Sequence, residues 1–264
     1  MKEKLKRVFW DIITAQLTWV VFFYYRKIII EKNAFEISET LIYGTIIVSL
    51  FWATVYALSG TYIEVQRVSR LNELYRTISQ SILGCLIIFF TLIIDDIVNY
   101  KSYVFYYQAI IALITLHFTI TFTARYIITS SMVKKIQKRE IQFNTILIGT
   151  EKSIFNTLKL LENSPKSSGN KCVGYISHET FEKIPIPRLG DMIDLEAILK
   201  HHNIQEAIIT SEKKEIEEIT NIINTLIYHD IHTKITPNLV DLLAGKVKMQ
   251  SLYNPTLIEV KKIK

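Results

Sequence analysis

Long apolar stretches fill the first half of the chain, and the second half mixes apolar and polar positions. A helix needs about 20 apolar residues, at a rise of about 1.5 Å each, to cross the hydrocarbon core of a membrane. Stretches of that length lie at about residues 8–26, 41–62, 78–97 and 104–128. The pattern predicts a bundle of four transmembrane α-helices within residues 1–130.

Beyond a basic juxtamembrane linker at 131–142, short apolar runs alternate with segments in which apolar residues recur at helical spacing. The runs that predict strands cover residues 143–149, 172–177, 207–210 and 232–236. This rhythm favours a parallel sheet with right-handed crossovers. The predicted fold class is therefore an α-helical membrane bundle followed by an α/β, Rossmann-like, doubly wound parallel-sheet domain at 143–250. We expect residues 251–264 to form a linker, and we expect Asp191 to cap a helix that follows it.

The positive charge of the chain is distributed unevenly around the apolar stretches. The net charge is +6 and the pI is about 9.1. Eleven basic residues flank one side of the predicted spans: Lys2, Lys4, Lys6, Arg7, Arg67, Arg70, Arg76, Lys134, Lys135, Lys138 and Arg139. The other side has four: Arg26, Lys27, Lys32 and Lys101. By the positive-inside rule, both termini are cytoplasmic in a bacterial inner membrane, and no nucleic-acid partner is needed to explain the charge.

Few ionisable residues lie inside the predicted spans, and His117 and Asp11 each have a structural explanation. We expect His117 to make a hydrogen bond between helices and Asp11 to pair with Arg7 at the cytoplasmic interface. No paired charges within the membrane are expected, so the bundle is interpreted as an anchor rather than a transporter. Cys85 and Cys172 lie in different halves and predict buried thiols, not a disulfide.

The segment FNTILIGTEKSI begins like the phosphate-binding turn of a dinucleotide-binding fold, but it has one glycine, Gly149, where that turn has three. The second and third glycines are replaced by Glu151 and Ile154. The ribose-binding carboxylate expected after the second strand is replaced by Ser177 and His178. We therefore do not expect NAD to bind in the usual way, and we predict no cofactor.

Two interpretations of the edge at the carboxyl ends of the strands stay open. It could bind a nucleotide or nucleotide-sugar, or the domain could be a scaffold without a ligand. The residues that would form the binding edge are Gly149, Thr150, Lys152, Ser153, Ser177, Ser211, Thr236 and Asn238. The sequence contains no Walker loop, zinc spacing or Ser-His-Asp set, so we predict no catalytic or metal-binding residue.

The order of these parts resembles one bacterial family. The resemblance lies in the first span, in ILIGT and in PNLVDLLAGKVKMQSLYNPTLIEV at 237–260. These features are similar to the N-terminal portion of the polyprenyl-phosphate sugar-1-phosphate transferases, such as undecaprenyl-phosphate glucose phosphotransferase. Such enzymes begin capsule, exopolysaccharide or O-antigen synthesis by moving a sugar phosphate from a nucleotide-sugar to undecaprenyl phosphate.

In that family a catalytic domain follows the segment that resembles 257–260, and no residue of this sequence matches its catalytic positions. The resemblance implies that this chain is inactive alone and anchors, positions or regulates a catalytic domain in the same or a neighbouring chain. Any Mg²⁺ would belong to that domain. The bilayer is the other expected partner, and a homodimer is also considered.

Two alternatives remain. One is the N-terminal part of a membrane-bound nucleotide-sugar 4,6-dehydratase. The other is a stand-alone membrane receptor for a nucleotide or nucleotide-sugar, which predicts saturable binding that Gly149→Val abolishes.

Overall fold

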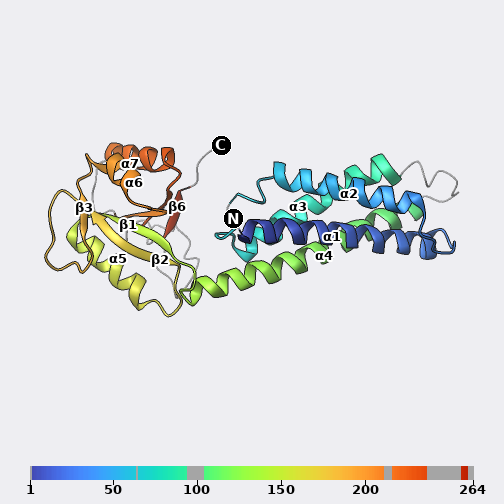
Figure 1. The fold of residues 1–264 in the computed structure, drawn as a ribbon, viewed down its shortest axis with the longest axis horizontal. Coiled ribbons are helices and arrows are strands. Elements are labelled where there is room, and N and C mark those ends of the chain that lie inside the picture. The colour runs from blue at the N-terminus through green and yellow to red at the C-terminus, as the bar shows by residue number, and fades with distance from the viewer. Residues whose placement is uncertain (1, 64, 94–103, 211–215, 237–256, 261–264) are drawn as a thin grey trace. The chain divides into compact units, whose positions relative to one another are not determined.

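The computed structural model describes residues 2–63, 65–93, 104–210, 216–236 and 257–260. The chain divides into two compact units, Met1–Val133 and Lys134–Lys264, which we call the helical unit and the sheet unit (Figure 1). Ser211, Asn238 and most of the segment 237–260 lie outside the described residues.

Four helices make up the helical unit, and each is long and apolar enough to cross a membrane. The first and third continue into π-helical turns, η1 and η2. The elements are α1 (Lys2–Tyr25), η1 (Arg26–Ile30), α2 (Glu39–Leu58), α3 (Arg70–Ile88), η2 (Phe89–Ile93) and α4 (Val104–Gln137). The prediction of four apolar helices is confirmed.

The helix boundaries differ from the predicted ones for local reasons. Helix α3 begins eight residues before the predicted start at residue 78, because the Ser69 hydroxyl caps it by accepting the N–H of Asn72. Helix α4 runs through the first part of the expected linker at 131–142. No Gly or Pro interrupts it, and the chain turns only at Arg139, which has a left-handed φ of 61°.

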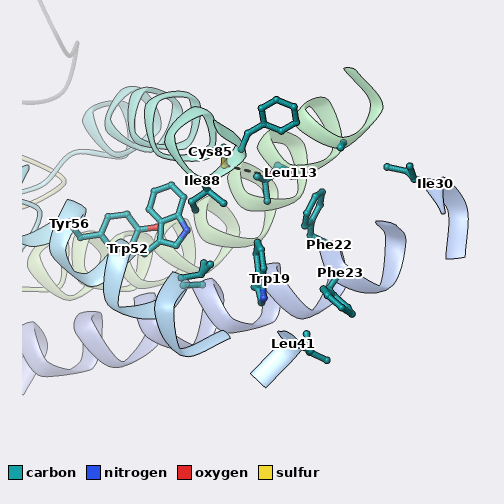
Figure 2. Close-up of a cluster of buried hydrophobic side chains, with 14 residues drawn as sticks. Trp19, Phe22, Phe23, Ile30, Leu41, Trp52, Tyr56, Cys85, Ile88 and Leu113 are labelled. Carbon is teal, nitrogen blue, oxygen red and sulfur yellow. Dashed lines mark hydrogen bonds between the residues drawn. The ribbon is translucent and has the colours of Figure 1, made fainter. Parts of the chain in front are cut away.

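Buried aromatic and aliphatic side chains form the core of the helical unit (Figure 2). Two of its indoles pack on glycines. A Cβ at Gly84 would lie 2.3 Å from the Trp52 ring, and a Cβ at Gly44 would lie 2.7 Å from Trp19. The absence of a side chain at these two glycines lets each indole lie directly on a neighbouring helix.

The sheet unit contains one six-stranded sheet in the order β3-β2-β1-β4-β5-β6. Its strands are β1 (Phe143–Gly149), β2 (Asn170–Ile176), β3 (Arg188–Gly190), β4 (Glu206–Thr210), β5 (His232–Ile235) and β6 (Ile258–Val260). The first five are parallel, and β6 pairs with β5 in the antiparallel direction. The order of the parallel strands is the one that doubly wound dinucleotide-binding sheets use.

Helices cover both faces of this sheet. Helix α5 (Glu151–Asn163) packs on the face that carries Leu147 and Ile208. Helices α6 (Leu195–His201) and α7 (Ile216–Tyr228) pack on the face that carries Ile146, Ile148 and Ile209. Alternate residues of β1 and β4 thus enter opposite cores, as expected for strands buried on both faces.

Three details of the sheet unit differ from the sequence predictions. Strand β3 was not predicted, because it is three residues long and follows a proline-rich segment. Strand β6 lies inside the expected linker at 251–264. Helix α6 begins after Asp194, so Asp191 is not its N-cap.

Candidate functional site

The candidate ligand edge lies where the parallel strands end. Gly149 is the last residue of β1, Thr150 is the N-cap of α5, and Ser177 and Thr236 follow β2 and β5. Lys152 lies in the first turn of α5 and is exposed. The structure therefore places these candidates along the carboxyl edge of the sheet.

The crevice between β1 and β4, where such sheets bind a pyrophosphate, is filled by the protein's own side chains. A Cβ at Gly149 would lie 2.0 Å from Thr210 Oγ1 and 2.4 Å from the Thr210 carbonyl oxygen. The Thr210 hydroxyl donates to the Ile148 carbonyl at 3.0 Å. Gly149 is needed here because Thr210 packs against its α-carbon.

Ser153 completes this packing. Its hydroxyl lies 2.9 Å from Thr210 Oγ1 and accepts the backbone N–H of Thr150 at 3.2 Å. The N-terminus of α5, which would face a phosphate, is thus partly capped by a residue of its own first turn. The sequence predicted Ser153 as a residue of the candidate edge but did not predict Thr210, because a threonine at the end of a strand carries no distinctive signal.

The other candidates do not join this hydroxyl cluster. Ser177 is buried, and its carbonyl accepts a hydrogen bond from Arg188 Nε at 2.9 Å. The Thr236 N–H donates to the Ile209 carbonyl at 3.0 Å and continues the β5 pairing. Within the described part of the chain, neither residue makes a hydrogen bond to Ser153 or Thr210.

A second polar group lies beyond β2 and β3. Asp191 Oδ1 lies 2.8 Å from His178 Nδ1 and accepts the N–H of Met192 at 2.5 Å. Desolvation raises the pKa of the Asp191 carboxyl, but the bonds from His178 and Met192 outweigh it and hold the pKa below its ordinary value. His178 also borders an open cleft of about 720 Å³ between α6 and α7.

That cleft mixes acidic, basic and amide side chains. Its polar lining includes Asp194, Glu196, Lys200, His201, Glu218 and Asn221. Among the described residues, no group of three or more His, Cys, Asp or Glu side chains could hold a metal ion. None of the described candidate residues of the edge at Gly149 lines this cleft.

The helical unit contains a cluster of buried charged side chains that was not predicted from the sequence. Arg7 donates to both carboxylate oxygens of Glu73 at 2.5 Å. Arg125 donates from Nε and Nη2 to the two oxygens of Asp11 at 2.8 and 3.1 Å, and from Nη1 to Gln80 Oε1 at 2.8 Å. All four charged side chains are at most 2% exposed.

His117 continues this cluster toward the middle of α4. Its Nε2 lies 2.9 Å from the Tyr56 hydroxyl and its Nδ1 lies 2.8 Å from Ser81 Oγ. The Trp52 indole stacks on the imidazole at 3.7 Å, and the Arg125 guanidinium lies 4.2 Å from the centre of the Tyr56 ring. The predicted interhelical hydrogen bond of His117 is confirmed.

Two expectations about this region are wrong. Asp11 pairs with Arg125 rather than with Arg7, and the helical unit does contain paired, buried charges. The two carboxylates balance the two guanidinium groups and each arginine has a carboxylate within hydrogen-bond distance, so the cluster carries no net charge. Such an arrangement joins α1, α3 and α4.

Comparisons with known proteins give little direct guidance. No protein-family model matches the chain, and no curated protein matches it. The crystal structure of UDP-D-quinovosamine 4-dehydrogenase from Vibrio fischeri is similar over 46% of this chain and 94% of its own, with 20% sequence identity and a TM-score of 0.34. A likeness at this TM-score carries no argument about the fold or function of this chain.

Proposed function

We propose that this protein is the membrane-anchoring and scaffold portion of an initiating sugar-phosphate transferase for bacterial surface polysaccharides. The four helices cross the cytoplasmic membrane, both termini are cytoplasmic, and the sheet unit lies in the cytoplasm. The reaction, transfer of a sugar phosphate from a nucleotide-sugar to undecaprenyl phosphate, belongs to a catalytic domain in the same or a neighbouring chain.

The observation that carries this proposal is the filled crevice between β1 and β4. Thr210 and Ser153 occupy the place where a nucleotide phosphate would approach Gly149. A sheet unit of this kind supports a neighbour more readily than it binds a nucleotide. The balanced charges of the helical unit favour the same role, because they bind helices together and, among its described residues, both buried carboxylates of the cluster are paired with arginine.

Strand β6 adds a further argument for a scaffold. Ile258–Val260 pairs with β5, so the segment that resembles the family's approach to its catalytic domain is attached to the sheet. A domain that followed β6 would be held close to the sheet unit rather than on a free linker.

A direct test purifies the tagged protein, with its bound partners, from its own membranes. The eluate is assayed for transfer of labelled sugar phosphate to undecaprenyl phosphate. Mass spectrometry then gives the intact mass of each polypeptide in the eluate. Transfer activity is expected, with the catalytic domain in a polypeptide heavier than 30.7 kDa or in a co-purified chain. An eluate with full recovery of the protein and no transfer would contradict the proposal.

The same preparation separates the two alternatives. A dehydratase portion would co-purify with dehydration of a nucleotide-sugar, and a receptor would bind a nucleotide-sugar saturably. Gly149→Val cannot separate a loss of ligand binding from a disturbed fold, because the valine side chain would collide with the Thr210 backbone. Lys152→Gln is the cleaner probe, since Lys152 is exposed and belongs to the same candidate edge.

A further inference from the structure

Three aromatic side chains form a strip along α4. Phe118, Phe122 and Tyr126 follow one another at a spacing of four residues. The ring centroids of the first pair are 5.4 Å apart with an interplanar angle of 8°, and those of the second pair are 5.8 Å apart. Tyr126 is 44% exposed, and the two phenylalanines are half-buried. The strip therefore borders the packed core and also faces outward.

A cation lies at one end of this strip. Arg70, the first residue of α3, is exposed, and its guanidinium lies 5.9 Å from the centre of the Tyr126 ring. No carboxylate among the described residues pairs with it. Arg7 and Arg125, at the same end of the helical unit, are both neutralised inside the bundle. Arg70 differs from them because its charge is available to a partner outside the protein.

The length of the strip matches one leaflet of a bilayer. Eight residues separate Phe118 from Tyr126, which is a rise of about 12 Å along a helix. Half of a hydrocarbon core is about 15 Å thick. With Arg70 at the membrane surface, the rings reach from the headgroup region to about the middle of the membrane.

We propose that the aromatic strip and Arg70 bind one anionic phospholipid of the cytoplasmic leaflet. The headgroup phosphate accepts hydrogen bonds from the Arg70 guanidinium, and one acyl chain lies along the three rings. A single guanidinium suits a phosphodiester with one negative charge. A polyprenyl chain would extend far beyond the strip, so the match favours a phospholipid. The inference rests on the proposed membrane orientation.

The experiment titrates the full-length protein in detergent micelles with phosphatidylglycerol or phosphatidylcholine of identical acyl chains. Native mass spectrometry counts the bound lipids. The parent protein is expected to retain one phosphatidylglycerol in preference to phosphatidylcholine. Arg70→Gln should weaken phosphatidylglycerol binding about fivefold and weaken phosphatidylcholine binding less, because the choline cation offsets the charge of its phosphate. Phe122→Leu should weaken it less.

Matched controls lie on α1, at the same end of the bundle. Lys6→Gln removes an exposed positive charge, and Phe9→Leu removes an aromatic ring that is 59% exposed. Neither should change phosphatidylglycerol binding. If Lys6→Gln weakened phosphatidylglycerol binding as much as Arg70→Gln, the positive charge at this end of the bundle would attract the lipid without a specific site. That result would overturn the inference.

Two further results would also overturn it. Equal retention of phosphatidylglycerol and phosphatidylcholine would indicate that the protein holds lipid without selecting a headgroup. If undecaprenyl phosphate were retained more tightly than phosphatidylglycerol, and in an Arg70-dependent way, the strip would be assigned to that lipid instead. Carbonate extraction of each variant from membranes separates this inference from the proposed function. Release of the parent protein by carbonate would contradict the anchor itself, whereas firm integration without selective lipid binding would contradict only the phospholipid site.

Discussion

The two units bury charged groups in different ways. The helical unit neutralises Arg7 and Arg125 with carboxylates from other helices. In the described part of the sheet unit the buried carboxylate is Glu206, which accepts from Lys234 Nζ at 2.5 Å and from the Asn170 amide. Lys234 keeps 18% of its side chain exposed. A charge in the sheet unit can thus reach water through its partner, whereas Arg7, Glu73, Asp11 and Arg125 are each at most 2% exposed and are paired inside the bundle.

This difference indicates where each unit is vulnerable. Loss of one charge from the helical unit leaves its partner in a place without water, which is costly. In the sheet unit the tightest packing surrounds Gly149, where a backbone oxygen and a hydroxyl exclude any side chain. The helical unit is therefore most sensitive to substitutions that break a charge pair, and the sheet unit is most sensitive to substitutions that add a side chain at Gly149.

The largest effect is expected from Arg125→Met, which leaves Asp11 without its bidentate partner. We expect a loss of about 3–5 kcal/mol in the free energy of unfolding, measured by SDS titration in mixed micelles with circular dichroism. The double variant Asp11→Leu/Arg125→Met removes both charges and should recover most of the loss. If the double variant were as unstable as the single one, packing rather than charge would dominate there.

The next effect is expected from Gly149→Val, which tests steric packing in the sheet unit. The new side chain would meet the Thr210 carbonyl oxygen, which cannot rotate away, so we expect about 1–3 kcal/mol of destabilisation. Hydrogen exchange of the full-length protein should become faster in β1 and β4 and stay unchanged in α1–α4. The matched control is Lys152→Gln, because Lys152 is exposed and lies three residues from Gly149. It should change neither the free energy of unfolding nor the hydrogen exchange of β1 and β4.

A smaller effect is expected from His117→Leu. Tyr56 and Ser81 would each lose a hydrogen-bond partner. Interhelical hydrogen bonds of this kind contribute about 0.6–1.7 kcal/mol, so the same SDS titration should show a loss in that range. A loss as large as that of Arg125→Met would mean that the imidazole supports the ion pairs as well.

The smallest effect concerns the reactivity of Cys172. Burial, with Glu162 and Glu206 nearby, raises the pKa of this thiol from 9.0 to about 12. At pH 8 the native thiol should hardly react with iodoacetamide, and unfolding should restore labelling. Because the folded-state pKa is raised, its contribution to stability is complete below about pH 9 and declines as the pH rises toward 12. Rapid labelling of the native thiol at pH 8 would contradict this environment.

Hydropathy and periodicity were sufficient to predict the four apolar helices and four of the five parallel strands. They could not predict the ion pairs, because sequence spacing suggested Arg7 for Asp11 and the actual partner is 114 residues away. The third helix was shortened in the prediction because its first two turns are polar. Those turns bury Glu73 and Thr77 in the bundle.

The sequence predicted a candidate edge around Gly149 but not the side chain that packs against this glycine. The single glycine after an apolar strand left open whether the edge binds a ligand. Whether a ligand or a side chain approaches Gly149 depends on Thr210, which reaches it from β4. Only the register of β1 and β4 brings the two residues together, and a single sequence does not contain that register.

The Asp11–Arg125 pair also has a consequence for the order of synthesis. A ribosome adds about 5–20 residues per second, so the 114 residues between the two partners take roughly 6–23 s to make. If α1 crosses the membrane as proposed, it enters during that interval with Asp11 but without Arg125, the base that pairs with Asp11 in the finished protein. Arg7, one helical turn away, is then the nearest cation, and we expect it to serve as a temporary partner. Nascent chains halted before α4 would integrate less well with Arg7→Gln than without it, and equal integration would refute this role.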